Sequence, residues 1–236
     1  MNVVIMTGGK GTRLAPYTQV LPKGLLPIGG QPILEIIIKQ LAHYGFKSIT
    51  MACGYLAPLI QTYFGDGSKW NVSIAYYVED QPSGTFGALK HMKHMFQQPF
   101  LLINCDILTT LNFRQFYDFH CSKSSMITIA SQIKRIPIDL GVIETDGDKV
   151  TKFIEKPNNT VHVNMGIYMI NPKVYDYLPE ENVLDTTDVI KNLLDRNHDI
   201  RHYQNDAFWL DIGKPADYKQ ANNVFKEMAE ILLPKG

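Results

Sequence analysis

A glycine-rich segment that carries two cations gives the strongest chemical signal in the sequence. Residues 8–27 read GGKGTRLAPYTQVLPKGLLP and directly follow the apolar run 3–6. Glycines let main-chain N–H groups approach an anion closely, and Arg13 and Lys23 can then neutralise its charge. The segment therefore predicts a loop that binds a polyphosphate, which indicates nucleotide chemistry.

Two better-known phosphate-binding loops do not match this segment. A P-loop requires Gly-Lys followed by Ser or Thr, whereas Lys10 precedes Gly11 here. The dinucleotide fingerprint requires a third glycine at the position that Leu14 occupies. The competing interpretation is a glycine-rich turn with exposed charges. We favour the binding loop because an apolar strand precedes it and prolines follow it.

Apolar periodicity predicts the elements that position this loop. Short apolar runs alternate with helical spacing through the first half, which is typical of a mainly parallel sheet with right-handed crossovers. The second half is richer in strands, and Asp146-Gly147-Asp148 indicates a hairpin turn. We predict strands at 3–6, 48–52, 72–78, 100–104, 127–133, 141–145, 149–155 and 162–170, and helices at 32–44, 57–64, 85–96, 187–194 and 215–233.

Three chemically interesting features follow the predicted strands of the first half. The glycine-rich loop follows the first strand, Glu79 follows the third and Asp106 follows the fourth. Ligands of parallel sheets bind at the carboxyl ends of the strands. We therefore expect these features to converge, although a turn or helix N-cap is the alternative role for Asp106.

Composition excludes several classes of protein. The 236 residues carry 23 Lys and Arg against 23 Asp and Glu, which argues against a general surface for nucleic acid or anionic membrane. No apolar stretch reaches transmembrane length, and the N-terminal run is too short for a signal peptide. The three cysteines have no zinc-site spacing and are odd in number. Reduced thiols in a cytoplasmic protein are therefore expected.

Motifs spread along the chain resemble those of the sugar-1-phosphate nucleotidylyltransferases. Several separated motifs in the family's order are far more specific than a single one. The pattern is most similar to the mannose-1-phosphate and D-glycero-D-manno-heptose-1-phosphate guanylyltransferases. The matching segments are GGKGTRL at 8–14, PKGLLPIGGQPIL at 22–34, SGTFGAL at 83–89, NCD at 104–106, EKP at 155–157, NMGIY at 164–168 and FWLDIGKPADY at 208–218.

The resemblance implies an α/β fold of one domain over residues 1–236. It would be a Rossmann-like three-layer sandwich with a mainly parallel mixed central sheet, the GT-A-like nucleotidyltransferase fold. The nucleotide-binding half would span about 1–110 and the sugar-phosphate-binding half about 111–236. Some relatives add a C-terminal β-helix, and we expect none here because the sequence ends at Gly236.

The resemblance also implies the reaction, in which a sugar 1-phosphate attacks the α-phosphorus of a nucleoside triphosphate. Such enzymes neutralise charge and align the reactants, with no covalent intermediate. Arg13 would grip the β- and γ-phosphates and Lys23 would lie beside the α-phosphate. Asp106 and Asp211 would bind Mg²⁺, which takes oxygen ligands. The triphosphate cradle would consist of Gly8, Gly9, Gly11 and Thr12.

Two positions near these residues depart from the family pattern. The family usually has Pro-Lys-Pro where this chain has Pro-Lys-Gly, and we expect Gly24 to loosen the backbone after Lys23. Relatives often have a tyrosine where this chain has Leu140. The resemblance implies that the sugar phosphate is bound by Gly141, Glu155, Lys156, Asn164 and Gly166. The alternative for Glu155 and Lys156 is a solvated hairpin end.

The nucleobase pocket carries a weaker signal. The resemblance places Gly84 and Thr85 against the base, and many thymidylyl- and uridylyltransferases have a glutamine where this chain has Glu79. A carboxylate only accepts hydrogen bonds, so it suits the adjacent N–H groups of guanine and repels the acceptors of uracil or thymine. We therefore favour GTP over UTP, dTTP or CTP. Glu79 could instead be an exposed strand end, with Gln81 offering an amide.

Two readings compete with the enzyme. Some relatives are catalytically inactive regulatory subunits, but these tend to lose the loop arginine, the lysine or the metal carboxylates, all present here. A glycosyltransferase would need a DxD motif after a strand, whereas the only one is the turn at 146–148.

The sugar and the oligomeric state stay open, although relatives often form dimers or tetramers. The substrates would be a nucleoside triphosphate and a sugar 1-phosphate, with Mg²⁺ as cofactor.

Overall fold

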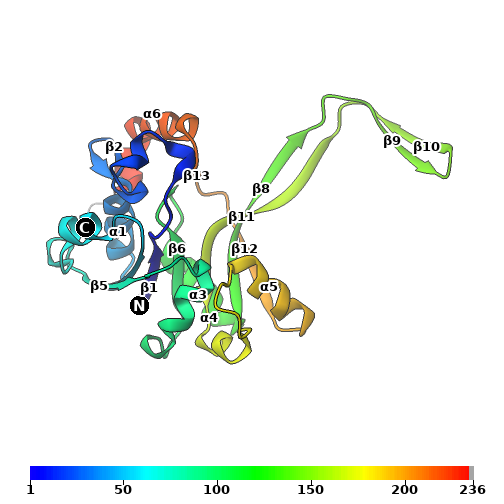
Figure 1. Cartoon of the computed structure of the whole chain (residues 1–236). Coiled ribbons are helices and arrows are strands. Elements are labelled where there is room, and N and C mark those ends of the chain that lie inside the picture. The colour runs from blue at the N-terminus through cyan, green and yellow to red at the C-terminus, as the bar shows by residue number, and fades with distance from the viewer. Residues whose placement is uncertain (234–236) are drawn as a thin grey trace.

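A seven-stranded sheet forms the centre of the computed structural model, which describes residues 1–233 (Figure 1). Strand β11 pairs antiparallel with both of its neighbours, whereas every other neighbouring pair in this sheet is parallel. The expected mainly parallel mixed sheet is therefore confirmed. The strands lie in the order β12 (Ile200–Gln204), β8 (Ile127–Pro137), β11 (Asn158–Ile170), β6 (Phe100–Asn104), β1 (Asn2–Met6), β4 (Ser48–Cys53) and β5 (Ser73–Val78).

Alternating side chains of the central strand divide the core into two layers. Val3 and Ile5 pack into one apolar cluster, and Val4 packs into another on the opposite face. Helices cover both faces, which confirms the three-layer sandwich. The first cluster includes side chains of α1 (Ile33–His43), α2 (Ala57–Phe64), α4 (Phe113–Lys123) and α6 (Pro215–Leu232), and the second those of α3 (Gly84–His91) and α5 (Thr186–Asp195). Each large apolar side chain that is fully buried stabilises the fold by about 2 kcal/mol.

Several elements differ from the sequence-based prediction. Helix α3 ends at His91, and a 3-10 turn at Lys93–Met95 replaces the rest of the predicted helix. Strand β8 continues to Pro137 and β11 begins at Asn158, so both are longer than predicted. The elements that were not predicted are α4, β12 and the short strands β2 (Pro27–Ile28), β3 (Gln31–Pro32), β7 (Ile107–Thr109) and β13 (Trp209–Asp211).

A two-stranded arm projects from the body of the protein (Figure 1). We define the arm as residues 132–163, which contain the outer parts of β8 and β11 and the hairpin of β9 (Val142–Asp146) and β10 (Lys149–Ile154). The predicted turn at 146–148 joins β9 to β10. None of the arm residues is buried.

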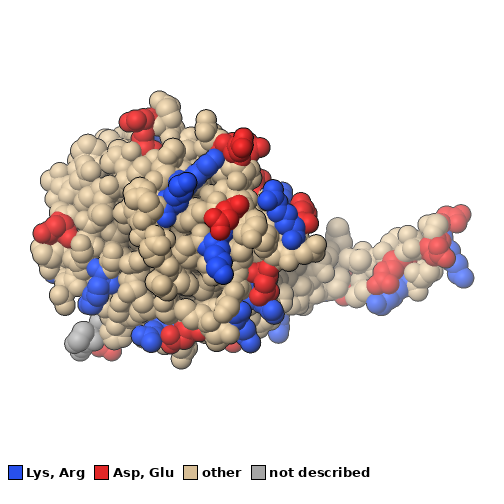
Figure 2. All heavy atoms as spheres, turned by 90° about the horizontal axis from the view of Figure 1, so that it is seen from below, with Lys and Arg blue, Asp and Glu red and all other residues tan. Residues whose placement is uncertain are grey.

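The remaining features of the fold concern the charged surface and the C-terminal part of the described residues. Figure 2 shows acidic and basic side chains interspersed on one face, with no large area of a single sign. Within residues 1–233 the chain contains no β-helix, and no helix there has the length and hydropathy needed to cross a bilayer. The end of the expected domain, 234–236, lies outside the described residues.

A buried histidine gives the fold a pH dependence. The His120 side chain is 1% exposed, and its Nδ1 lies 2.8 Å from Thr128 Oγ1. Burial lowers the pKa of His120 to about 4, against 6.5 for a free histidine. As the pH falls, His120 therefore takes up a proton in the unfolded chain before it does so in the folded chain. The free energy of unfolding falls by on the order of 3 kcal/mol as the pH drops from 6.5 to 4.

Urea titrations between pH 7.5 and 4 check this expectation. His120→Gln should flatten the pH dependence of the unfolding free energy. His43→Gln is the matched control, because His43 is exposed on α1. An equal pH slope in the wild type and in His120→Gln would show that another group is responsible.

Candidate active site at the carboxyl ends of the strands

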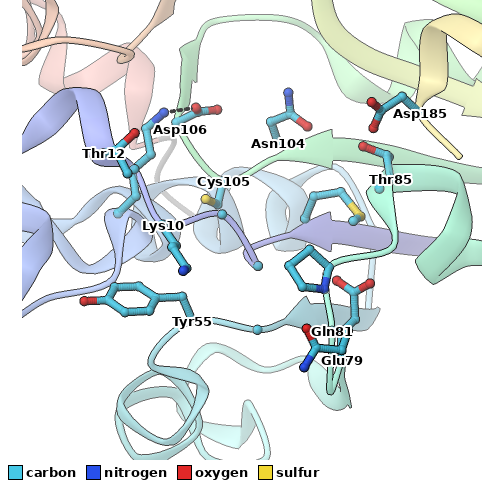
Figure 3. A pocket seen from close by; sticks show the side chains of 18 of the residues that line it. Lys10, Thr12, Tyr55, Glu79, Gln81, Thr85, Asn104, Cys105, Asp106 and Asp185 are labelled. Atoms are coloured by element: carbon cyan, nitrogen blue, oxygen red, sulfur yellow. Dashed lines mark hydrogen bonds and ion pairs between the residues drawn. The ribbon is translucent and has the colours of Figure 1, made fainter. Parts of the chain in front are cut away.

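A cavity of about 780 Å³ opens where β1, β4, β5 and β6 end (Figure 3). The loops that follow these strands all contribute to its lining, as expected for a parallel sheet. The structure thus brings together most of the residues predicted to serve the nucleotide. Those that line the cavity are Gly8, Gly9, Gly11, Thr12, Arg13, Lys23, Glu79, Gly84, Thr85 and Asp106.

Hydrogen bonds at Thr7 and at Gly11 hold the two ends of the glycine-rich loop in place. The buried Thr7 hydroxyl donates to Ala52 O at 2.9 Å, which anchors the start of the loop on β4. Gly11 has a φ of 60°, a conformation that glycine adopts at little cost, and Thr18 Oγ1 donates to its carbonyl oxygen at 2.8 Å. No heavy atom lies within 4 Å of where a Cβ of Gly9 would be. The loop therefore leaves room for a ligand against its backbone.

Lys23 is held more firmly than the sequence suggested. It begins a 3-10 turn in which Leu25 N–H donates to Pro22 O at 2.9 Å and Leu26 N–H donates to Lys23 O at 3.1 Å. A Cβ on Gly24 would lie 2.4 Å from Leu34 Cδ1. The expectation of a loosened backbone was therefore wrong, because Gly24 is needed for close packing on α1.

Asp106 combines an ion pair with an unsatisfied oxygen. Lys23 Nζ pairs with Asp106 Oδ2, and the two side chains are only 11% and 16% exposed. The other oxygen, Asp106 Oδ1, is buried and has no hydrogen-bond partner. A buried carboxylate oxygen without a partner is costly, so a cation bound there would stabilise it.

Asp211 reaches the same place from the other end of the chain. In the β7–β13 pair Asp211 lies opposite Ile107, and Ile212 N–H donates to Asp106 O at 3.0 Å. Burial and the nearby charge of Asp106 raise the pKa of Asp211, while the cations Lys23 and Arg13 oppose this rise. Two carboxylates so close together repel each other unless a cation lies between them.

These two carboxylates fit Mg²⁺, which commonly takes one or two carboxylates and completes its shell with phosphate and water oxygens. Within residues 1–233, no group of three or more His, Cys, Asp or Glu side chains could hold a metal without such additional ligands. Arg13 lies beside Gly213, two residues after Asp211, because a Cβ on Gly213 would be 3.3 Å from Arg13 Nη2. Asp211 itself does not appear in the cavity lining.

Cys105 also lines the cavity, but its thiol has low reactivity. Burial and the neighbouring Asp106 raise the pKa of the Cys105 thiol far above the ordinary value. The thiol therefore stays protonated at neutral pH and is a poor nucleophile. This favours direct transfer over a covalent intermediate on Cys105.

Glu79 is tied to the segment that follows it. Its Oε1 accepts a hydrogen bond from Ser83 N at 3.2 Å and another from Ser83 Oγ. A Cβ on Gly8 would lie 3.2 Å from Glu79 Oε2, so the carboxylate also abuts the glycine-rich loop. Gln81 lines the cavity as well (Figure 3).

Gly84 lets a distant segment enter the site. It has a φ of 75°, and a Cβ there would lie 2.6 Å from Leu184 O and 2.8 Å from Asp185 Oδ1. Leu184 N–H donates to Ser83 O at 2.9 Å and Leu184 O accepts from Phe86 N–H at 2.9 Å. These bonds hold Asp185 at the cavity, beside Thr85 and Asn104 (Figure 3).

The residues predicted to serve the sugar phosphate lie outside this cavity. Asn164 and Gly166 lie at the base of the arm, where Asn164 Oδ1 accepts from Gly166 N–H at 2.9 Å. A Cβ on Gly166 would be 3.0 Å from Asn104 Nδ2, so this base adjoins the cavity. Gly141, Glu155 and Lys156 are exposed on the arm, and the structure does not bring them to the cavity of the same chain.

Sequence reasoning missed some cavity residues and mentioned others only in passing. Lys10 and Asn104 stood within predicted motifs, and each follows or ends a buried strand, which was a usable signal. Tyr55 follows β4 in the same way. Asp185 carried no such signal, because it reaches the cavity only through the contacts of Leu184 with α3.

Comparisons with known proteins agree with this architecture. A model of the family described as nucleotidyl transferase matches residues 2–227. A UTP–glucose-1-phosphate uridylyltransferase of Synechocystis sp. is 32% identical, over 99% of this chain and 66% of its own length. A mannose-1-phosphate guanylyltransferase of Mycobacterium tuberculosis is 31% identical, over 92% and 62%.

A solved structure extends the likeness to three dimensions. HddC from Yersinia pseudotuberculosis, complexed with GMP-PN, superposes with a TM-score of 0.73 at 25% identity and covers 95% of this chain and 99% of its own. The chain belongs to the nucleotidyl transferase family. It spans 66% and 62% of the lengths of the two sequence relatives.

Proposed function

We propose that this protein transfers a nucleotidyl group from a nucleoside triphosphate to a sugar 1-phosphate and releases pyrophosphate. The observation that carries the proposal is the convergence of the glycine-rich loop, Lys23 and Asp106 on one cavity. The two sequence relatives are named as transferases for glucose 1-phosphate and mannose 1-phosphate, which supports the same reaction. The free cysteines Cys53, Cys105 and Cys121 suit a reducing compartment, so the cytoplasm is the proposed location.

In the proposed mechanism the chain neutralises charge and aligns the reactants. Backbone N–H groups of the loop 8–12 bind the triphosphate, and the Arg13 guanidinium binds the departing pyrophosphate through paired hydrogen bonds. Lys23 turns from Asp106 toward the α-phosphate, where negative charge accumulates during in-line attack by the sugar-phosphate oxygen. Asp106 and Asp211 would hold Mg²⁺, which supplies further neutralisation of the phosphates.

An activity matrix tests the proposal. The protein is incubated with Mg²⁺, each of GTP, UTP, dTTP and CTP, and a panel of sugar 1-phosphates, and pyrophosphate release is measured. We expect release to require both substrates. No release in any combination would contradict the proposal and favour the inactive regulatory homologue.

We further propose that GTP is the preferred nucleotide. Glu79 lies at the cavity, and its Oε2 has no hydrogen bond among residues 1–233, so this oxygen can accept from an N–H group of guanine. The relatives include both a guanylyl- and a uridylyltransferase, so similarity to them does not identify the base. The proposal therefore depends on the pocket residues of this chain.

Glu79→Gln is expected to reduce the preference for GTP over UTP by roughly 10-fold or more, because an amide can pair with uracil whereas a carboxylate repels its oxygens. The ratio of kcat/KM for the two nucleotides measures this. Ser83→Ala is the matched control, because it removes a hydrogen bond to Glu79 and keeps the carboxylate. An unchanged ratio in Glu79→Gln would remove Glu79 from base recognition.

A further inference from the structure

Several large apolar side chains of the arm are exposed to solvent. On the hairpin, Leu140 is 74% exposed and Phe153 is 66% exposed, and Ile143 and Val150 are each more than half exposed. The Phe153 ring lies over Gly141, where a Cβ would be 2.6 Å from its Cζ, but nothing covers its outer face. An isolated two-stranded ribbon is marginally stable in water, so this arm needs a partner surface.

The arm also carries functional residues away from their own cavity. Glu155 and Lys156 lie between β10 and β11, at the inner end of the β9–β10 hairpin, whose turn at 146–148 forms the tip of the arm. Lys156 has a φ of 43°, a conformation that is unfavourable for a non-glycine residue and is concentrated at functional sites. We therefore expect the exposed Glu155-Lys156 motif to contact a ligand or a protein surface.

The pairing of β8 with β11 holds the arm away from its own body. Residues 131–137 of β8 pair without interruption with 158–164 of β11. After a register shift between Asn164 and Tyr168, the same two strands continue into the central sheet, so the arm extends that sheet. In this position the arm is directed away from its own cavity, so we take a second copy of the chain as the occupant of its exposed surface.

The cavity has an end that such an arm could complete. Asn104 and Asp185 lie at the end of the cavity away from Lys10 (Figure 3). No ion pair joins Asp185 to a lysine or arginine within residues 1–233. Gly166, at the base of the arm, adjoins the same end. A lysine supplied there would pair with Asp185 and meet the phosphate of the sugar substrate.

We propose that two copies of the chain exchange arms, so that Glu155 and Lys156 of one copy complete the sugar-phosphate end of the other copy's cavity. This inference rests on the proposed function for the roles of these two residues. A two-fold arrangement satisfies both cavities with one interface, as in most homodimers. The arm contains five basic and five acidic residues, so its net charge does not oppose the approach of a second copy.

The oligomeric state gives the first test. Analytical ultracentrifugation of the full chain should show a dimer, and Leu140→Ser combined with Phe153→Ser should raise its dissociation constant by roughly 30-fold or more, the effect of losing buried anchors. Ile231→Ser is the matched control, because Ile231 is 61% exposed on α6. A monomeric wild type, or an arm variant as dimeric as the control, would overturn the proposal.

Subunit complementation gives the second test. Asp106→Asn lacks a working body and Lys156→Ala lacks a working arm, so each homodimer should be nearly inactive. The two chains are co-expressed with different affinity tags and purified through both. Arm exchange then builds one complete site per heterodimer, and we expect roughly half of the wild-type rate. A heterodimer as inactive as its parents would show that each arm serves its own chain.

The two tests separate this proposal from the proposed function. If the wild type catalyses no transfer in the activity matrix, the function fails, and ultracentrifugation of the arm variant still decides whether the arms mediate a dimer. If the wild type is active and the heterodimer is not rescued, the function stands and the exchange fails.

Discussion

Asp106→Asn is expected to lower turnover by about 1,000-fold or more, equivalent to about 4 kcal/mol of transition-state stabilisation. The reason lies in the two oxygens of this side chain. Asp106 Oδ2 pairs with Lys23, and Asp106 Oδ1 is buried with no partner. An asparagine has the same shape but no negative charge, so it pairs poorly with Lys23 and binds a divalent cation weakly.

Three measurements make this expectation specific. The variant should show reduced kcat at saturating Mg²⁺, weaker binding of Mn²⁺ by calorimetry, and a melting temperature close to that of the wild type. Asp118→Asn is the control, because Asp118 is an exposed carboxylate paired with Arg114 on α4. A near-normal rate in Asp106→Asn with Mg²⁺ would show that Asp106 is not a metal ligand.

The convergence of the predicted nucleotide-site residues on one cavity has a physical reason. The glycine-rich loop, Glu79 and Asp106 each follow a buried strand, and parallel strands place their carboxyl ends at one edge. Local pattern and sheet geometry therefore suffice to bring them together. The pairing of Asp211 with Asp106 had no such basis, because it depends on the short β7–β13 ladder, which periodicity did not reveal.

The sugar end was beyond the reach of sequence patterns. The hairpin around 146–148 was predicted, but its direction in space depends on β8 and β11 continuing well past the body. The predicted strands 127–133 and 162–170 stop close to where the arm begins, and their pattern did not reveal that β8 and β11 stay paired beyond the body. Helix α4 was missed for a related reason, since its apolar face is narrow and its N-cap, Asn112, was the only strong local signal.

The ion pair between Lys23 and Asp106 predicts that replacing Lys23 has two opposite effects. Lys23 Nζ pairs with one oxygen of the carboxylate that would bind a metal ion, so it competes with the metal for this negative charge. Lys23→Met should therefore bind Mn²⁺ roughly 10-fold more tightly without nucleotide, because a buried carboxylate that has lost its partner gains more from a cation. Turnover should fall by about 100-fold or more, since the α-phosphate loses the charge that stabilises the transition state.

Titration of Mn²⁺ by electron paramagnetic resonance, beside kcat measured with Mg²⁺, separates these two effects. Lys10→Met is the comparison, because Lys10 lines the same cavity and makes no ion pair with Asp106 within residues 1–233. It should change the affinity for Mn²⁺ less than Lys23→Met does, although both variants lose one positive charge. If Lys23→Met weakened Mn²⁺ binding, Lys23 would be positioning Asp106 for the metal, and the exchange of Lys23 from carboxylate to phosphate would have to be abandoned.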